Sequence, residues 1–281
     1  NTGKKLKNWE IKINYGIKTG LNQAFIVDTE TKEKLCEQIK INRGLLTGLN
    51  EAFIVDHSLK EKLCAENSQN SELFVPILRG RDVHQYQANW ANLWLILTKN
   101  GVDIEKYPSI KKHLESFENI KKRSDQGENW WNLRACAYYE DFEKPKIIYP
   151  ETTVRRSEFY LDLEKHYIDK TCFMITANRS EDLYYLLGIL TSGLIEWYLE
   201  EELRTLGKIT VQYSKQYIEN IPIPVIENEK QSAIYWQIVE LMQNLKTANI
   251  FATKSILNDL VAKLFDLTTE EKEEINLKTK P

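Results

Sequence analysis

Residues 13–40 read INYGIKTGLNQAFIVDTETKEKLCEQIK, and residues 41–68 read INRGLLTGLNEAFIVDHSLKEKLCAENS. The two segments are identical at 17 of 28 positions, which indicates that one unit was duplicated in tandem. Each copy has two short runs of strand-forming residues around a Thr-Gly-Leu-Asn turn, then a Lys/Glu-rich segment that ends in Leu-Cys. Gly and Asn tolerate the positive φ of tight turns, so each copy is predicted to form a β-hairpin followed by a short helix.

Downstream of the repeat, the hydrophobic pattern alternates and predicts further strands at residues 73–78, 94–98, 146–149, 158–163 and 171–175, with a helix over 104–123. From Ser180 the period becomes helical, with one long helix expected over Leu183–Leu199. The segment Ile221-Pro222-Ile223-Pro224 cannot be helical and marks a boundary. Beyond it, two amphipathic helices are expected at 232–245 and 254–265, and Thr268-Thr269-Glu270-Glu271 has the pattern of a capped helix start.

These patterns predict an α+β fold with two parts. A mixed, β-rich domain is expected over residues 1–225, with the repeat at 13–40 and 41–68, followed by a helical C-terminal subdomain over residues 226–281. The chain of 281 residues is 42 % hydrophobic and 28 % charged, so it is long enough and apolar enough to bury a sizeable core. The start at Asn1 rather than Met suggests a piece of a longer protein.

Composition excludes several classes of protein. No run approaches 18 apolar residues, so no transmembrane helix is expected and we predict no membrane partner. The four cysteines form no CxxC pair, which favours reduced thiols in a cytoplasmic protein over a zinc site. The four histidines are scattered, so no metal-ligating set is expected.

The net charge is −3, and it is unevenly spread. Residues 1–150 sum to +3 and residues 151–281 to −6. Binding to DNA needs a local basic surface rather than a basic total, so the first half permits one. Solvated charged faces without any partner are the alternative on charge alone.

The sequence contains no recognisable catalytic motif. Dinucleotide-binding, Walker, nucleophile-elbow and zincin motifs are absent, as is the Asn-Pro-Pro-Tyr loop of amino-methyltransferases. We therefore predict that this chain carries no catalytic residues and acts as a binding module, with no cofactor of its own.

Several basic segments suit contact with nucleic acid, and each has a structural alternative. Arg79-Gly80-Arg81-Asp82 places two guanidinium groups on a turn, where they would reach phosphates or guanine edges, or else form an Arg–Asp pair that holds the turn. The Lys111-Lys112-His113 and Lys121-Lys122-Arg123 segments flank a predicted helix and would contact phosphates, although such runs are more often a solvated helix face. The Trp130-Trp131 pair before Arg134 would stack on bases or pack in the core, and packing is the more common outcome.

Two further segments add candidates. Arg155-Arg156 follows a predicted strand, and the donor-rich stretch from Gly207 to Lys215 precedes the boundary. The complete set of predicted DNA-binding residues is Lys18, Asn22, Arg79, Arg81, Lys111, Lys112, Lys121, Lys122, Arg123, Arg134, Arg155, Arg156, Lys208, Gln212 and Lys215.

Taken in order along the chain, these segments resemble the TaqI-like C-terminal specificity domain, which is the target-recognition region of adenine-N6 DNA methyltransferases and type IIG restriction-modification proteins. The resemblance rests on an ordered set that covers nearly the whole chain: Gly16–Val27, Pro76–Val83, Trp131–Arg134, Lys144–Tyr149, Leu187–Ser192, Tyr213 with Ile221–Pro224, and Leu260–Thr268. The duplicated Thr-Gly-Leu-Asn unit departs from the single copy that this family would have.

The resemblance implies a division of labour within a longer prokaryotic protein. This chain would bind double-stranded DNA and select the sequence, while an N-terminal methyltransferase region of the same polypeptide would bind S-adenosylmethionine, with Mg²⁺ if a nuclease is also present. Two alternatives stay open: a DNA-specificity subunit without its own chemistry, and a protein-interaction scaffold of a phage-defence system that docks through the acidic helical tail.

Overall fold

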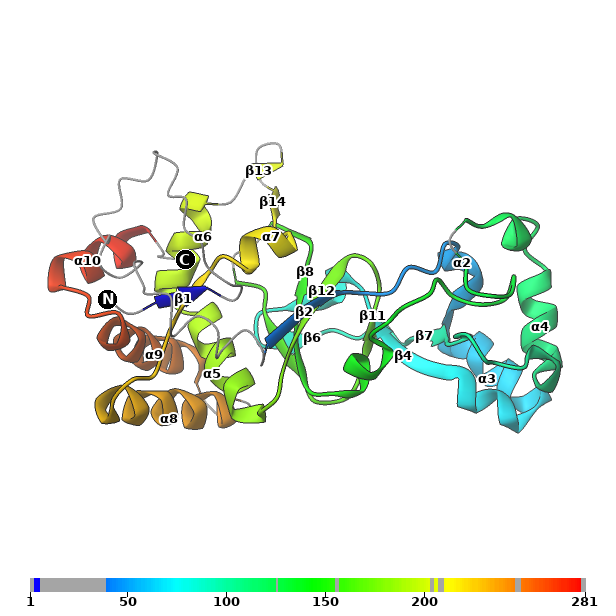
Figure 1. Ribbon diagram of the computed structural model, residues 1–281, viewed down its shortest axis with the longest axis horizontal. Coiled ribbons are helices and arrows are strands. Elements are labelled where there is room, and N and C mark those ends of the chain that lie inside the picture. The colour runs from blue at the N-terminus through cyan, green and yellow to red at the C-terminus, as the bar shows by residue number, and fades with distance from the viewer. Residues whose placement is uncertain are drawn as a thin grey trace.

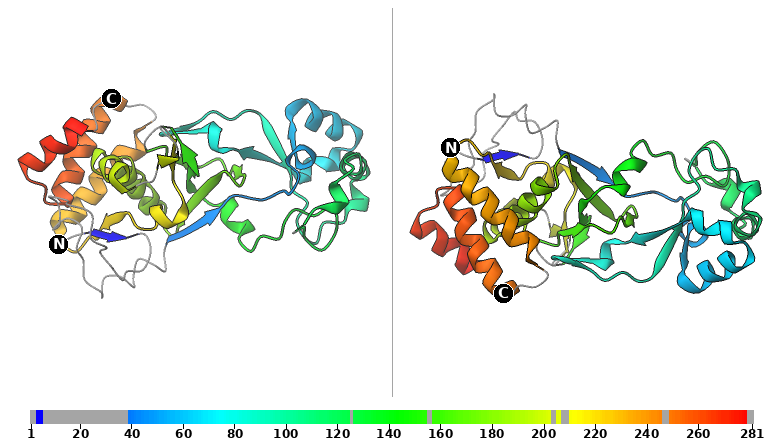
Figure 2. Two further views of the ribbon diagram at one scale, coloured as in Figure 1. Left: turned by 90° about the horizontal axis from the view of Figure 1, so that it is seen from above. Right: turned by 90° about the horizontal axis from the view of Figure 1, so that it is seen from below.

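The computed structural model describes residues 3–5, 39–124, 126–154, 157–202, 205–206, 210–245 and 249–278. The molecule is elongated, with helices gathered at one end, small sheets in the middle and a second lobe at the other end (Figure 1). β1 (Gly3–Lys5) and α10 (Thr269–Lys278), the first and last described elements, both lie at the helical end (Figure 2). The first copy of the repeat, up to residue 38, lies outside the described residues.

A four-stranded antiparallel sheet connects the two ends of the molecule. Its strand order is β10 (Tyr160–Asp162), β8 (Lys146–Pro150), β12 (Cys172–Ala177) and β2 (Ile39–Arg43). The predicted strands at 146–149, 158–163 and 171–175 are thereby confirmed within a residue or two at most of their ends.

This central sheet is buried on both faces, because successive side chains of a strand point to opposite sides. On β8 and β12, one set of alternate residues belongs to a core that includes the C-terminal helices: Ile147, Tyr149, Phe173 and Ile175. The other set belongs to the core of the second lobe: Ile148, Cys172 and Met174. The sheet therefore separates two hydrophobic cores and belongs to both.

At the helical end, α5 (Ser180–Leu190) packs against α8 (Glu229–Gln243), with α6 (Gly193–Glu202) and α9 (Ile250–Leu264) completing the core. Gly188 allows the close approach of α5 to α8, since a Cβ atom there would lie 2.5 Å from Cγ2 of Ile238. This core includes helices from both sides of residue 225.

The single helix expected over Leu183–Leu199 is wrong, because the structure divides it into α5 and α6. Between them, Thr191 Oγ1 donates to the carbonyl of Leu187 at 2.7 Å, and Ser192 Oγ donates to that of Ile189 at 2.7 Å. Hydroxyl groups that bond to preceding carbonyls compete with the helical backbone and disturb it. Gly193 then begins α6 with its N–H donated to Asn258 Oδ1 at 2.8 Å.

The C-terminal helices agree with the sequence pattern. The capped start of α10 is confirmed, since Thr268 Oγ1 accepts from the N–H of Glu271 and Glu271 Oε2 accepts from the N–H of Thr268. The Ile-Pro-Ile-Pro boundary forms the edge strand β15 (Pro222–Pro224), which pairs with β1. No helix of the described residues is long and apolar enough to cross a membrane.

The second lobe, called here the distal lobe, contains a mixed sheet with helices packed against it. The sheet order is β11 (Tyr167–Ile168), β4 (Phe74–Leu78), β7 (Leu93–Ile96) and β3 (Ile54–Asp56). Its helices are α2 (Asn50–Phe53), α3 (His57–Glu66) and α4 (Pro108–Glu115). The expected strands at 73–78 and 94–98 correspond to β4 and β7.

The hairpin expected in the second repeat copy is wrong. β2 pairs with β12 in the central sheet, whereas β3 pairs with β7 in the distal lobe, so the two segments diverge instead of folding back. The chain crosses from one sheet to the other at Gly44, where a Cβ atom would lie 1.9 Å from the carbonyl oxygen of Asp169. The following helix is confirmed as α3, with Asp56 capping its start.

The helix expected over 104–123 is also wrong in extent. Only α4 is α-helical, and short 3-10 turns at Ile104–Lys106 and Ile120–Lys122 flank it. The remaining short elements are the hairpin β5 (Val83–His84) with β6 (Gln87–Ala88), the strands β9 (Thr152–Thr153), β13 (Thr205–Leu206) and β14 (Thr210–Gln212), the helix α7 (Lys215–Ile218), and 3-10 turns at Ser68–Leu73, Gly80–Asp82 and Tyr139–Glu143.

A fully buried ion pair lies in the register of the central sheet. Lys146 on β8 is directly opposite Asp162 on β10, and Lys146 Nζ lies 2.7 Å from Asp162 Oδ2. The ammonium also donates to the carbonyl of Phe142, and His166 Nδ1 lies 2.9 Å from Asp162 Oδ1. Every charge in this network has a partner, as burial requires.

Replacing Asp162 with Asn is expected to lower the free energy of unfolding by about 3–5 kcal/mol, because it leaves the Lys146 ammonium buried without a counter-charge. Urea denaturation followed by circular dichroism measures the change. The matched control is Asp259→Asn, an exposed aspartate on α9, which should change stability by less than about 0.5 kcal/mol. Equal effects of the two substitutions would contradict the prediction.

Burial alone would raise the pKa of Asp162, but the hydrogen bond from His166 and the attraction of Lys146 outweigh it and lower this pKa. The carboxylate therefore stabilises the fold above the unfolded-state pKa of about 3.9, and this contribution is lost as the pH falls through the lower folded-state value. The carboxyl ¹³C resonance of Asp162 should titrate below that reference value. A midpoint at or above it would show that burial dominates.

Candidate nucleic-acid interface

The predicted basic residues divide into those whose charge is already used within the fold and those whose charge is exposed. Ten of the fifteen predicted residues belong to the part of the chain that the structure describes. Lys18, Asn22, Arg155, Arg156 and Lys208 lie outside the described residues.

The turn at Arg79 shows the structural alternative for one of its two arginines. Arg79 Nε and Nη2 each donate to Asp82 at 3.0 Å, and the Arg79 N–H donates to the same carboxylate at 2.8 Å. The bond to Asp82 raises the pKa of Arg79, and Asp82 is buried. Arg81, two residues on, is exposed and has no ion pair in the described parts of the chain.

Arg123 is a second predicted residue whose geometry is structural. Its guanidinium donates to the carbonyls of Thr47 at 2.6 Å, Trp130 at 2.6 Å and Asn132 at 2.9 Å, and lies over the Phe53 ring. Burial lowers its pKa. The side chain joins three loops of the distal lobe, so its donors are not presented to a ligand.

Other predicted residues are also partly engaged. Lys111 on α4 lies 2.6 Å from Glu105, and Lys215 on α7 lies 3.3 Å from Glu219. Gln212 is half-buried on β14, where it is opposite Thr152 of β9. Exposed ion pairs of this kind contribute little stability, and they also reduce the local positive charge.

The lysines of the distal lobe retain exposed charge. Lys112, Lys121 and Lys122 are exposed, and none of them forms an ion pair with a residue that the structure describes. Lys121 Nζ lies 4.9 Å from the centroid of the Trp130 ring, and Trp130 is in edge contact with Trp131. Both tryptophans are half-buried against the core of the distal lobe, in agreement with the packing role expected for them. Arg134 is exposed three residues beyond Trp131.

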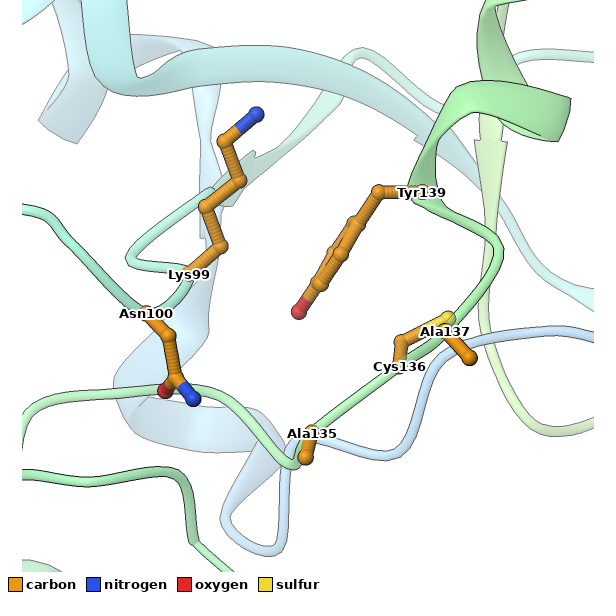
Figure 3. A pocket seen from close by; sticks show the side chains of 6 residues that line it. All are labelled: Lys99, Asn100, Ala135, Cys136, Ala137 and Tyr139. Atoms are coloured by element: carbon orange, nitrogen blue, oxygen red, sulfur yellow. The ribbon is translucent and has the colours of Figure 1, made fainter.

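A hollow of about 380 Å³ opens beside this basic surface (Figure 3). It is lined by Lys99 and Asn100 from the turn after β7, and by Ala135, Cys136, Ala137 and Tyr139 from the loop that follows Arg134. Lys99 Nζ lies 5.9 Å from the centroid of the Tyr139 ring, and the Tyr139 hydroxyl donates to the Arg134 carbonyl at 3.3 Å.

Two hydrogen bonds from side chains to backbone carbonyls connect the turn that lines the hollow with the tryptophan segment. Trp131 Nε1 donates to the carbonyl of Val102, and Asn132 Nδ2 donates to that of Lys99 at 3.1 Å. Sequence reasoning missed Lys99, Asn100 and Tyr139. The available signal was Asn100-Gly101, a turn dipeptide at the end of a predicted strand, with a lysine before it.

Residues 75–223, more than half of the chain, match the family model described as the TaqI-like C-terminal specificity domain. The chain belongs to this family. The hollow, Arg81 and the exposed lysines all lie within the matched range. The expected resemblance is therefore confirmed, and the TaqI-like domain includes the central sheet except β2.

The chain is also similar in sequence to one curated protein and in structure to two solved proteins. The type II methyltransferase M.BanIII of Aneurinibacillus aneurinilyticus is 24% identical over 176 residues, which cover 59% of this chain and 30% of the relative. The structure of the type IIL restriction-modification enzyme MmeI in complex with DNA superposes with a TM-score of 0.62 at 11% identity, covering 85% of this chain and 36% of that one. The type IIG restriction endonuclease BpuSI gives a TM-score of 0.46 at 12% identity, covering 85% and 31%.

The chain spans about a third of the length of these proteins. The likeness to MmeI confirms the predicted mixed α+β architecture with a helical C-terminal region. Among the described residues, no group of three or more His, Cys, Asp or Glu is placed to hold a metal ion.

Replacing Arg123 with Gln is expected to lower the free energy of unfolding by roughly 2–4 kcal/mol, because several loop carbonyls lose their donor. The neighbouring residue provides the control: the free energy of unfolding of Lys122→Gln should stay within about 0.5 kcal/mol of that of the unsubstituted chain. Thermal and urea denaturation of the two variants test this contrast. An Arg123 variant as stable as the parent would mean that its side chain is free to act elsewhere.

Proposed function

We propose that this chain recognises a specific sequence in double-stranded DNA, as the C-terminal specificity domain of a type II restriction-modification enzyme or an adenine-N6 DNA methyltransferase. The observation that carries the proposal is the group of exposed basic side chains within the family-matched range, namely Arg81, Lys112, Lys121, Lys122 and Arg134. In this role the chain positions DNA for a catalytic region that lies outside it, in the cytoplasm of a prokaryote.

The charge distribution supports this assignment better than the total charge does. A net charge of −3 would oppose DNA if it were evenly spread. Phosphate contacts supply affinity and require only a local cluster of lysine and arginine, while side chains at base edges supply the choice of sequence.

Methyl transfer in the parent protein would use S-adenosylmethionine, with Mg²⁺ if a nuclease is present, and we place both outside this chain. The hollow in Figure 3 does not suit S-adenosylmethionine. Its charged group is the Lys99 ammonium, which would repel the sulfonium of that ligand, and no carboxylate lines it to bind ribose hydroxyls. An N-terminal methyltransferase region of the same polypeptide is the partner that we propose.

A protein-interaction scaffold is the second candidate. The exposed large apolar side chains of the helical end include Trp236 on α8 at 50% and Phe251 on α9 at 82%. Exposed apolar groups of this size are typical of contact surfaces between proteins. This role predicts a chain without measurable DNA affinity.

The first candidate predicts binding to duplex DNA that weakens steeply with salt. Replacing Lys121 and Lys122 together by Gln should reduce the slope of log K against log salt by up to about 0.9 for each phosphate that the variant no longer neutralises. Fluorescence polarisation with labelled duplexes between about 50 and 200 mM salt measures the slope. Lys62→Gln, an exposed lysine on α3, is the matched control.

Arg81→Gln should likewise weaken DNA binding without a loss of stability, whereas Arg79→Gln should destabilise the turn because Asp82 loses its partner. The absence of salt-dependent binding to any duplex would favour the scaffold role. Unchanged binding in the lysine variant would remove this surface from the interface and leave the family assignment intact.

A further inference from the structure

The hollow beside the tryptophan pair presents hydrogen-bond donors. Asn100 Oδ1 accepts from the N–H of Glu128 at 3.1 Å, so its NH₂ group is the part left to meet a ligand. Lys99 contributes an ammonium, which has donors alone. Both residues belong to the turn after β7, and in Figure 3 this turn lies across the hollow from Tyr139, with the Lys99 and Asn100 side chains extending in different directions along that side.

The opposite wall adds no negative charge to the hollow. The Tyr139 hydroxyl already donates to the Arg134 carbonyl, and burial raises the pKa of this phenol, so it stays protonated. Burial also raises the pKa of the Cys136 thiol. Ala135 and Ala137 end in methyl groups and leave the floor open. A ligand with acceptors on its edge therefore suits the Lys99 ammonium and the Asn100 NH₂ group.

The bases of DNA differ in this respect at the major groove. Guanine presents two adjacent acceptors, O6 and N7, whereas adenine pairs one acceptor with a donor, and cytosine presents a donor. Phosphate oxygens are also acceptors, but the exposed Lys121 and Lys122 lie outside the hollow and are better placed for a protruding backbone. The neutral amide beside the ammonium, and the methyl groups of Ala135 and Ala137, favour a base edge.

We propose that Lys99 and Asn100 read the O6/N7 edge of a guanine in the recognised sequence. The inference rests on the proposed function and deepens it, because it names the base that this part of the interface selects. Lys121 lies over the Trp130 ring, Trp130 contacts Trp131, and Trp131 donates to the carbonyl of Val102 beside the same turn. Contact with the DNA backbone and reading of the base would therefore occur on adjoining surfaces.

The first step of the test is selection of bound duplexes from a randomised library by the 281-residue chain, which gives its preferred sequence. Lys99→Met keeps the side-chain stem and removes the ammonium, so preference for guanine at one position should fall tenfold or more. Lys62→Met is the matched control and should leave the selected sequence unchanged.

Asn100→Asp gives a second, independent variant. It retains the acceptor for the Glu128 N–H and replaces the donating NH₂ group by an oxygen acceptor. Since carboxylates accept from the cytosine amino group, the selected base at that position should change away from guanine. The melting temperature of each variant verifies that it is folded.

Duplexes with 7-deazaguanine at the selected position complete the test, since this analogue lacks the N7 acceptor and still pairs with cytosine. The unsubstituted 281-residue chain should bind the analogue tenfold or more weakly than the guanine duplex. For the Lys99→Met variant this loss of affinity should be no more than twofold. Equal weakening on all sequences would assign Lys99 to a phosphate and overturn the inference, as would an unchanged selection profile in both variants. If the parent protein selects no sequence at all, the proposed function itself fails, and this inference fails with it.

Discussion

The burial of both faces of one sheet is the constraint on which the rest of the structure depends. β8 and β12 supply alternate side chains to two different cores, so neither core closes without the same strands. A sheet with two buried faces can hold a charge only where the charge is paired, and Lys146 meets that condition by lying opposite Asp162. The network that continues to His166 fixes β10 against β8 and the loop that follows.

The basic side chains of this chain serve two different purposes. Arg79 and Arg123 use their planar guanidinium groups to satisfy a buried carboxylate and several loop carbonyls, a task for which several fixed donors are suited. By contrast, Lys112, Lys121 and Lys122 of the distal lobe are exposed. Their ammonium groups suit long-range attraction of a polyanion better than they suit the bracing of loops.

Much of the architecture could be predicted from the sequence, because it depends on local patterns. Alternation identified the strands of the central sheet, and the cap at Thr268 identified α10. The errors arose where distant residues decide. Nothing local shows that β2 and β3 join different sheets, since this depends on the close approach of Gly44 to Asp169. The break after α5 depends on two hydroxyl groups that a hydrophobic period does not register. For the candidate interface, charge alone could not separate Arg123 from Lys122, because the difference lies in loop carbonyls that are distant in sequence. The hollow was missed because two loops that lie more than thirty residues apart form it together.

The path of the chain through the central sheet has a consequence for how such domains diversify. The polypeptide leaves the sheet after β2, builds most of the distal lobe, and returns as β8, with β12 lying between the two strands. Because β2 and β8 both pair with β12, the segment between them can lengthen, shorten or be exchanged while the strand order of the central sheet is kept. The contacts that must be preserved are the pairing of β11 with β4 and the packing of Ile148, Cys172 and Met174 in the core of the distal lobe. Exchange of the distal lobe is therefore compatible with an unchanged central sheet and helical end.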